Sequence, residues 1–373
     1  MLRGIILSGG WGTRLRPLTC VRPKTLIPVV NKPVIERQIL HLKTAGVKEV
    51  VLAVSVMADD LKKYFGDGER LGIKIIYTEE KHPLGTAGAI KLAEEYLKDD
   101  DFFMLNGDVI FNFDFNEIVA AHKKFGGTGV IASKIVDDPS RYGVLITEEK
   151  TNRIIKFLEK DEYKLPKDGP VPMPINAGIY LLKPEIFSYI EPNKRVSIEK
   201  EVFPKIAEEG KLFHYPIKGI WKDMGKPEEL LDANFMLLRD LIEKLPDTKN
   251  LIDPTFKIEE NVKINAPVAI GANTIIKSNS TIGPNVVIGN NVYIGENTII
   301  KDSLIYDDVY IENNVLIDKA IISDNCYINS SVELRGKNQS LVILSSCVEV
   351  LEGKKIKVST DKHFTVCHHE VVK

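Results

Sequence analysis

Isoleucine recurs at every sixth position in the C-terminal third of the chain, and this period constrains the fold more than any other feature. Glycine often follows the isoleucine, and asparagine often stands two residues after the glycine, as in IGAN and IGEN. A sustained period of six is typical of a parallel β-helix, whose isoleucines point inward and stack from coil to coil. Glycine and asparagine suit its tight corners. The repeat comprises Ile258, Ile264, Ile270, Ile276, Ile282, Ile288, Ile294 and Ile300.

The register of the repeat slips by one residue after Ile300 and by one more before Ile322. With three hexads in each coil, we expect a left-handed parallel β-helix of about four coils over residues 255–334. Residues 335–373 lose the repeat. Two stretches there, LVILSSCVEVLEG and KIKVST, read as strands that cap the end of the helix.

Residues 1–245 show a different pattern, in which strand-like apolar runs alternate with helical spacing. Such alternation predicts βαβ units and a mostly parallel, Rossmann-like sheet, which makes the first part of the chain an α/β domain. Its last helix is expected to begin at Pro227, and residues 246–254 then read as a linker. Asp114 is placed to cap a helix. The expected strands are 4–7, 49–55, 72–79 and 101–110, and the expected helices include 33–46 and 227–245.

Composition excludes several classes of function. The net charge is −2, so no broad basic field suggests a nucleic-acid partner. No apolar run approaches the ~20 residues that a membrane-spanning helix needs. The four cysteines form no CxxC pair, which argues against a structural zinc site or a disulfide framework and fits the reducing cytosol. We therefore expect a cytoplasmic protein without nucleic-acid or membrane partners.

The loop GGWGTRLRPLT, which starts at Gly9, follows the first strand and combines bare backbone with fixed positive charge. Glycines let backbone N–H groups approach a phosphate, and an arginine fork matches phosphate oxygens. The loop is not a Walker motif, because no Gly-Lys in the chain precedes Ser or Thr. Nor is it the dinucleotide fingerprint, because Leu15 stands where a third glycine belongs. Taken alone, the loop fits a phosphate cradle or a structural turn equally well.

Asp108 also lies near the end of an expected strand. Ligands of open parallel sheets bind at the carboxyl ends of the strands. Gly9–Thr13 and Asp108 are therefore expected to share one crevice.

The whole loop, followed by Pro23-Lys24, resembles the signature of the sugar-1-phosphate nucleotidylyltransferases. Further motifs follow the order of that family: LGTAG (84–88), NGD (106–108), FLEK (157–160), INAG (175–178) and WKDMG (221–225). The segment SIEKEVFPKIAEEGKL (197–212) and the β-helix extension look most like GDP-mannose pyrophosphorylases. The resemblance covers the chain except its final ~40 residues.

The resemblance implies a role for individual residues. Arg14 and Lys24 would be catalytic, and Asp108 and Asp223 would bind the divalent metal. The sugar phosphate would contact Gly143, Glu159, Lys160 and Asn176. The nucleotide would contact Leu7, Gly9, Gly10, Gly12, Thr13, Gly85 and Thr86.

The implied reaction needs no protein nucleophile. A sugar-1-phosphate oxygen attacks the α-phosphorus of a nucleoside triphosphate in line, and pyrophosphate leaves. Two polyanions must meet, so positive charge and positioning are expected to carry the rate. Mg²⁺ is the expected cofactor, because it prefers one or two carboxylates together with phosphate and water. For single residues the alternatives are a turn or cap for each aspartate and a solvated surface lysine for Lys24.

Other functions stay open at this point. The family motif continues EKP, whereas this chain has a long Pro-rich insertion after Glu159-Lys160, beside the expected sugar pocket. The insertion leaves the sugar preference open. Because the resemblance implies that the base is contacted mostly through backbone, UTP or dTTP with glucose-1-phosphate is an alternative to GTP with mannose-1-phosphate. A non-catalytic subunit that senses a nucleotide sugar is a second alternative, although the chain retains all four charges of the signature.

The β-helix itself suggests an acyltransferase, since many such helices use a histidine base. None of the seven histidines lies in 255–345, which argues against that activity. The Cys367-His368-His369 cluster near the chain end reads as a solvated tail rather than a metal site. We expect the coils to contact other subunits or the catalytic domain, and to serve homo-oligomer assembly or stability more than chemistry.

Overall fold

The computed structural model describes residues 2–148, 150–160, 162–166, 169–245 and 248–373. The chain divides into two compact units that do not follow chain order. Met1–Trp11 and Val34–Trp221 form the first, here called the sheet unit. Gly12–Pro33 and Lys222–Lys373 form the second, here called the β-helix unit. The expected linker at 246–254 begins with two residues that lie outside the described ones, as do residues 161, 167 and 168 of the Pro-rich insertion.

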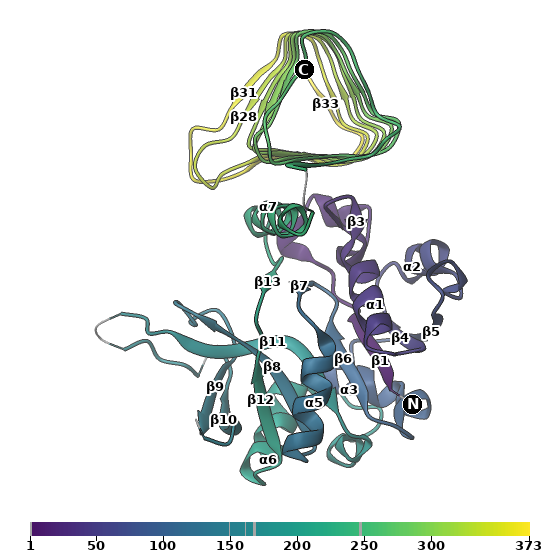
Figure 1. The fold of residues 1–373 in the computed structure, drawn as a ribbon, viewed down its shortest axis with the longest axis vertical. Helices are drawn as coiled ribbons and strands as arrows, with labels where there is room; N and C mark the ends of the chain where they lie inside the picture. Colours follow the sequence, from purple (N-terminus) through teal and green to yellow (C-terminus); the bar gives the residue numbers. More distant parts are fainter. Residues whose placement is uncertain (1, 149, 161, 167–168, 246–247) are drawn as a thin grey trace. The chain divides into compact units, whose positions relative to one another are not determined.

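The sheet unit is built on one sheet, which Figure 1 shows in its lower part. Among the described residues the sheet has nine strands. In spatial order they are β5 (Lys74–Glu79), β4 (Glu49–Val54), β1 (Arg3–Ser8), β6 (Phe102–Asn106), β11 (Met173–Leu182), β8 (Gly129–Val136), β12 (Leu212–Pro216), β10 (Arg153–Leu158) and β9 (Val144–Glu148).

The direction of these strands confirms a mostly parallel sheet. β1 runs parallel to both β4 and β6, and β4 runs parallel to β5. Of the described strands in this sheet, β10 and β11 run against the rest. The expected strand 101–110 is two strands, because the chain turns at Gly107-Asp108 between β6 and β7 (Val109–Asn112).

The helices of the sheet unit pack on this sheet and bury an apolar core. Large side chains such as Phe102, Phe203 and Tyr180 are fully buried there. Asp114 caps α5 as expected, since its carboxylate accepts a hydrogen bond from the Asn116 backbone N–H at 2.9 Å. The helices are α1 (Val34–Thr44), α2 (Ala58–Phe65), α3 (Gly85–Leu92), α4 (Glu94–Leu97), α5 (Phe115–Phe125) and α6 (Phe203–Glu208).

The β-helix unit stacks short parallel strands on three faces, and Figure 1 shows its triangular coils. The first face carries β14 (Asn250–Ile252), β17 (Val268–Ile270), β20 (Val286–Ile288), β23 (Ser303–Ile305), β26 (Ala320–Ile322), β29 (Val342–Leu344) and β32 (Phe364–Val366). The second carries β15 (Lys257–Ile258), β18 (Ile275–Ile276), β21 (Tyr293–Ile294), β24 (Tyr310–Ile311), β27 (Tyr327–Ile328), β30 (Glu349–Val350) and β33 (Val371–Val372). The third carries β16 (Lys263–Ile264), β19 (Thr281–Ile282), β22 (Ile299–Lys301), β25 (Leu316–Asp318), β28 (Glu333–Arg335) and β31 (Lys355–Lys357).

The hexad pattern explains this stack. Ile276 pairs with Ile294, and Ile294 pairs with Ile311, so inward isoleucines meet in register. Asparagine takes the corners as expected: Asn297, with a φ of +53°, is one of several corner asparagines in the left-handed region. Glycine acts differently at Gly271, where a Cβ would lie 2.5 Å from the Gly289 carbonyl oxygen of the next coil. Its role there is close approach of the coils.

The slips of register leave the stack intact because the corner between the third face and the first face loses one residue. After Ile300, the single residue Asp302, with a φ of +47°, joins β22 to β23. The strands after residue 335, which were expected to cap the helix, continue it: Val342 pairs with Ala320, and Val342 in turn pairs with Phe364. Apolar residues still fill the inward positions there, and Leu344, Val350 and Ile356 are again spaced by six, although Leu344 follows Leu334 by ten residues.

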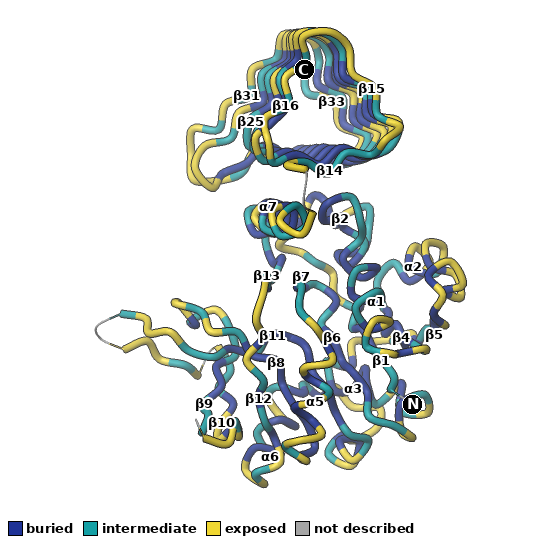
Figure 2. The backbone as a smooth tube through the Cα atoms, in the orientation of Figure 1, coloured by how far each residue is buried: buried dark blue, intermediate teal, exposed yellow. Residues whose placement is uncertain are grey.

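The first face of the coils is buried on its outer side as well. From β17 to β29 its outward residues are as buried as its inward ones, and Figure 2 shows this face largely in dark blue. Within the same unit, the Asn31 side chain donates to the Ile288 carbonyl at 2.6 Å, and Arg239 of α7 (Pro227–Glu243) donates to Asn285 at 2.7 Å. The buried outward residues are Ala269, Val287, Leu304, Ile321 and Ile343.

The helix α7 starts at Pro227, as the sequence predicts. It ends at Glu243, two residues before the predicted end at 245, and Leu245 is exposed. Two short strands, β2 (Pro28–Val29) and β3 (Lys32–Pro33), pair beside it, and the Val30 N–H donates to the buried Asn234 side chain at 2.8 Å. Across the described residues, no helix is both long and apolar enough to span a bilayer.

Candidate active site

The site begins at the carboxyl ends of β1 and β6. β4 lies on one side of β1 and β6 on the other, so the strand order reverses here, which is where open α/β sheets bind ligands. Leu7 pairs with Asn106, and the Gly107 N–H donates to the Leu7 carbonyl at 3.0 Å. The structure therefore brings Leu7 next to the turn that carries Asp108, and Gly9 continues from the same strand end.

Gly9, which is half-buried, and Gly10, which is exposed, follow at this edge. A Cβ on Gly9 would lie 3.4 Å from the Ser55 side chain and 3.5 Å from a Glu80 oxygen, which is ordinary contact. A Cβ on Gly10 would meet nothing within 4 Å. Packing does not require glycine at position 10, and the open space fits a backbone that a ligand approaches.

The turn at Asp108 is held by a residue that the sequence analysis missed. Gln38 of α1 is 1% exposed and donates from one nitrogen to both the Asn106 and Val109 carbonyls, each at 2.9 Å. The signal was a glutamine on the buried face of the predicted helix 33–46.

Gly85 and Thr86, predicted to contact the nucleotide, start α3. Gly85 has a φ of +73°, and a Cβ there would lie 2.6 Å from the Val196 carbonyl oxygen. The Thr86 hydroxyl donates to Glu199 at 2.7 Å and accepts from the Ile198 N–H at 2.8 Å. Gly85 thus packs against Val196, and Thr86 ties α3 to the π-helical turn Ile198–Val202. Contact of the two residues with a nucleotide stays a prediction.

Two residues predicted for the sugar phosphate lie together. The Asn176 N–H donates to the Gly143 carbonyl at 2.8 Å, and its side chain donates to the Tyr180 hydroxyl at 2.8 Å. Gly178 follows with a φ of +71°, and a Cβ on it would lie 2.8 Å from the Asn106 side chain. The INAG segment therefore reaches the strand end that precedes Asp108.

Glu159 directly follows β10 and lies beside a second carboxylate, Glu199. Burial, and then the charge of Glu199, raise the pKa of Glu159 above its ordinary value of 4.5. Both residues line a cavity of about 380 Å³, to which Lys200 also contributes. Lys160 is exposed.

Tyr180 connects these groups from inside the sheet. It is fully buried, and burial, followed by the charge of Glu199, raises the pKa of its hydroxyl well above 10. The hydroxyl therefore stays protonated, and it accepts the Asn176 hydrogen bond. Glu199 is the second residue that sequence analysis missed: it stood inside the quoted segment SIEKEV without an assigned role.

The remaining signature residues belong to the β-helix unit. Gly12 has a φ of +57°, and a Cβ there would lie 2.9 Å from the Thr19 side chain and 3.1 Å from the Lys24 Cβ. The Thr19 hydroxyl donates to the Gly12 carbonyl at 2.8 Å. Gly12 and Lys24 are thus neighbours. Lys24 is 9% exposed, so the alternative of a solvated surface lysine is wrong.

Arg14 lies in the short 3₁₀ helix Thr13–Leu15, next to the WKDMG segment. A Cβ on Gly225 would lie 2.9 Å from an Arg14 guanidinium nitrogen and 3.0 Å from a Glu229 oxygen. Glycine at 225 therefore leaves room for the Arg14 side chain beside buried Glu229. Asp223, two residues earlier, ends β13 (Ile220–Asp223).

The predicted residues are thus divided between the two units. Leu7, Gly9, Gly10, Asp108 and the sugar-contacting residues belong to the sheet unit, whereas Gly12, Thr13, Arg14, Lys24 and Asp223 belong to the β-helix unit. Within the described residues, no group of three or more His, Cys, Asp and Glu side chains is arranged for a metal ion. Two carboxylates fit the donor set that Mg²⁺ takes when phosphates and water complete it.

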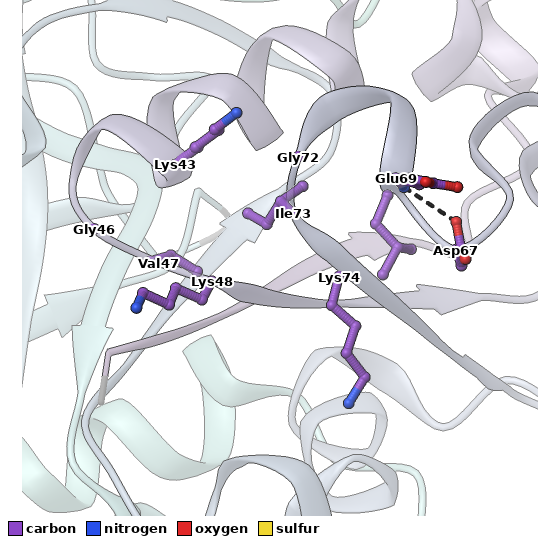
Figure 3. A pocket seen from close by; sticks show the side chains of 10 residues that line it. Lys43, Gly46, Val47, Lys48, Asp67, Glu69, Gly72, Ile73 and Lys74 are labelled. Atoms are coloured by element: carbon purple, nitrogen blue, oxygen red, sulfur yellow. Dashed lines mark hydrogen bonds between the residues drawn. The ribbon is translucent and has the colours of Figure 1, made fainter.

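A larger cavity of about 760 Å³ lies at the other end of the sheet (Figure 3). Val47 and Lys48 line it just before β4, and Ile73 lines it just before β5. These are amino-terminal strand ends, so this cavity does not belong to the site at Gly9 and Asp108.

Comparison with known proteins agrees with this geometry. Residues 3–240 match the family model described as "Nucleotidyl transferase", and residues 250–356 match the "EIF2B subunit epsilon LbH domain". The chain therefore belongs to the nucleotidyl transferase family and carries a left-handed β-helix domain.

Individual curated relatives and solved structures are also similar to the chain. The chain is 42% identical to the mannose-1-phosphate guanylyltransferase catalytic subunit beta of Xenopus tropicalis, over 70% of this chain and 74% of that protein. It is 43% identical to the mannose-1-phosphate guanyltransferase of Saccharomyces cerevisiae, over 69% of this chain and 73% of that protein. A putative glucose-1-phosphate thymidylyltransferase from Bacillus anthracis superposes with a TM-score of 0.57 at 28% identity, covering 67% of this chain and 98% of that one. HddC from Yersinia pseudotuberculosis, complexed with GMP-PN, superposes with a TM-score of 0.53 at 28% identity, covering 63% of this chain and 98% of that one.

Proposed function

We propose that the protein transfers a guanylyl group from GTP to mannose-1-phosphate, giving GDP-mannose and pyrophosphate. The observation that carries this proposal is that Arg14, Lys24, Asp108 and Asp223 are all retained in a chain at least 42% identical to two enzymes named for this reaction. The same four charges argue against a non-catalytic sensing subunit. Residues 1–245 would carry the reaction.

The proposed residues would have two tasks: they would hold the phosphates in position and neutralise negative charge. The mannose-1-phosphate oxygen attacks the α-phosphorus of GTP in line, the bond to the β-phosphate oxygen breaks, and pyrophosphate departs. Arg14 would hold the triphosphate and balance the charge on the leaving group, and buried Lys24 would face the transferring phosphate. Asp108 and Asp223 would bind Mg²⁺, which supplies positive charge to the phosphate oxygens.

Substrate recognition would use mainly residues of the sheet unit, together with Gly12 and Thr13 of the β-helix unit. The Glu159 carboxylate and the Asn176 side chain suit hydrogen bonds to sugar hydroxyls. Gly143 would contact the sugar through its backbone, and Lys160 would contact the sugar phosphate. Leu7, Gly9 and Gly10 would present backbone to the nucleotide, with Gly12 and Thr13 following. The base would lie at Gly85, where contact through backbone leaves the choice between GTP, UTP and dTTP to be measured.

The test is a matrix of purified protein with each nucleoside triphosphate and each hexose-1-phosphate, with Mg²⁺ present and pyrophosphate release as the readout. We expect GTP with mannose-1-phosphate to give the highest kcat/KM. Higher kcat/KM for UTP or dTTP with glucose-1-phosphate would replace the substrate assignment. A matrix without any release would overturn the enzyme assignment.

We also propose that the β-helix mediates a homo-oligomer. On its second face, Tyr293, Tyr310 and Tyr327 stack with ring centroids 4.4 and 5.0 Å apart, and Tyr310 and Tyr327 are more than a third exposed. Such exposed aromatic stripes are common in interfaces. Tyr310→Glu should then lower the molar mass measured by light scattering, and an unchanged mass would remove this face from the assembly.

A further inference from the structure

The β-helix holds the loop that carries Arg14 and Lys24, and one ion pair is central to this attachment. Residues 12–33 belong to the same compact unit as the coils. The Arg22 guanidinium pairs with the carboxylate of Asp324, which lies at the corner between β26 and β27. These two residues are 302 positions apart in sequence. Neither residue was predicted to have a role.

The pair is shielded from solvent and has further support. The Arg22 side chain is 24% exposed and that of Asp324 is 13% exposed. The Arg22 guanidinium also lies 5.8 Å from the ring centroid of Tyr306, which is buried, and this distance allows a cation–π contact. The Ser323 hydroxyl donates to the same Asp324 oxygen at 3.2 Å. An arginine held in this way has one preferred position.

Two further hydrogen bonds fix the same segment to the coils. The buried Ser345 hydroxyl donates to the Pro17 carbonyl at 3.2 Å, and the Asn31 side chain donates to the Ile288 carbonyl at 2.6 Å. The anchors therefore stand at positions 17, 22 and 31. Arg14 lies just before the first, and Lys24 lies between the second and the third.

The Arg22 anchor connects to Lys24 through one stiff residue. Pro23 separates them, and its ring fixes φ, here at −58°. Lys24 in turn lies against Gly12, which precedes Thr13 and Arg14. A displacement of Arg22 would thus shift Lys24 first and the Gly12–Arg14 turn with it.

We propose that Arg22 is a positioning residue for guanylyl transfer, and that the Asp324 corner of the β-helix belongs to the support of the active site. This inference rests on the proposed function. It also changes the expectation that the β-helix serves assembly or stability more than chemistry. The ion pair acts on Lys24 and Arg14, whereas the residues proposed to bind the sugar lie in the sheet unit.

The test compares Arg22→Ala, Asp324→Ala and the double variant in the full-length protein. We expect each single change to lower kcat between about ten- and a hundredfold, since a small misplacement of a charged group has effects of that size. KM for mannose-1-phosphate should stay unchanged. Because the two side chains act as one pair, the double variant should be no slower than the slower single variant. Arg22→Lys, which keeps the charge, should recover part of the rate.

Two measurements separate positioning from loss of fold. The stoichiometry of GTP binding gives the folded, competent fraction, and it should remain at the wild-type value in every variant. Hydrogen exchange of the backbone amides in 13–27 should become faster in Arg22→Ala, while exchange in β26 and β27 stays the same.

Arg239→Ala is the matched control, because Arg239 also bonds the β-helix but lies on α7. It should leave both kcat and the exchange of 13–27 unchanged. Wild-type kcat in Arg22→Ala, multiplying effects in the double variant, or an equal loss in Arg239→Ala would overturn the proposal. If the wild-type protein itself showed no activity, the proposed function would fail, and hydrogen exchange would still decide whether Arg22 orders the loop.

Discussion

The two units of this protein encode their structures in different ways. In the β-helix the sequence repeats, and each inward position performs the same task as the one six residues earlier. In the sheet unit no position repeats another, because each strand ends in a loop with its own chemistry. A period therefore identifies an architecture without any knowledge of function, whereas the site residues of the sheet unit have meaning only as a set.

The same residue types show this difference. Asn297 and Asn176 are both asparagines, but Asn297 is one of many similar corners, while Asn176 lies in a strand and bonds both Gly143 and Tyr180. Loss of one repeat residue should weaken stability in proportion to its burial. Loss of one site residue should affect activity and leave stability almost unchanged. The four predictions below test this contrast.

The largest effect is expected at the two proposed metal ligands. Asp108→Asn and Asp223→Asn should each lower the rate of pyrophosphate release about 10²- to 10³-fold, since each removes a negative charge that would bind Mg²⁺ beside the reacting phosphates. Steady-state assays over a range of Mg²⁺ concentrations measure this, with melting temperature as the check on folding.

Asp114→Asn serves as the control for those changes. Asp114 caps α5, and asparagine is an equally good cap, so both activity and stability should remain at the wild-type level. Turnover like that of the wild type in either Asp108→Asn or Asp223→Asn would remove that residue from the metal site.

The next effect is on stability alone and uses two isoleucines of the same repeat. Ile294 is fully buried, whereas Ile258, in the first coil, is 46% exposed. Ile294→Ala should destabilise the β-helix by about 2–5 kcal/mol, because it removes buried methylenes and leaves a cavity. Ile258→Ala should cost about 1 kcal/mol or less. Urea denaturation measures both, and equal losses would show that burial does not distinguish the two positions.

Much of the fold could be predicted because local patterns determine it. The hexad repeat predicts the coils, and the capping signals at Asp114 and Pro227 correctly predict where two helices begin. The continuation of the coils to Val372 was missed because valine and leucine replace most of the inward isoleucines. Two steps of ten residues, from Leu334 to Leu344 and from Ile356 to Val366, also interrupt the period of six. The assignment of residues 12–33 to the β-helix unit could not be predicted either, since Arg22 and Asp324 are far apart in sequence and no pattern links them.

The candidate site was predicted through motifs, and its supporting residues were not. Gln38 holds the Asp108 turn and Glu199 holds Thr86. A glutamine on the buried face of a predicted helix is a signal that does not identify its partner, and a glutamate in a helical turn has no local signature. Their roles arise from tertiary contacts that bring separate strands and helices together. No pattern within a single sequence shows which of its residues make these contacts.

A smaller effect on activity is expected at Glu159. Glu159→Gln should raise KM for mannose-1-phosphate about tenfold at neutral pH, since it weakens a hydrogen bond to a charged acceptor, with little change in melting temperature. Burial and Glu199 raise the pKa of Glu159, so the carboxylate is lost at a higher pH than usual as the solution is acidified. KM of the wild type should therefore rise as the pH falls towards this pKa, and KM of Glu159→Gln should change less with pH. Parallel pH profiles would argue against contact between Glu159 and the sugar.

The smallest effect is expected at one corner of the β-helix, where the side chain is exposed and only the backbone conformation is under test. Asn297 has a φ of +53°, and an alanine in the left-handed region costs about 1 kcal/mol more than a residue that tolerates it. Asn297→Ala should therefore lower the urea midpoint of the β-helix slightly, and Asn297→Gly should lower it less, because glycine adopts this conformation without strain. Activity should be unchanged in both. If alanine were tolerated as well as glycine, the preference for asparagine at these corners would have to come from its side-chain hydrogen bonds, such as the one between Asn273 and Asn291 at 3.3 Å, and not from its backbone.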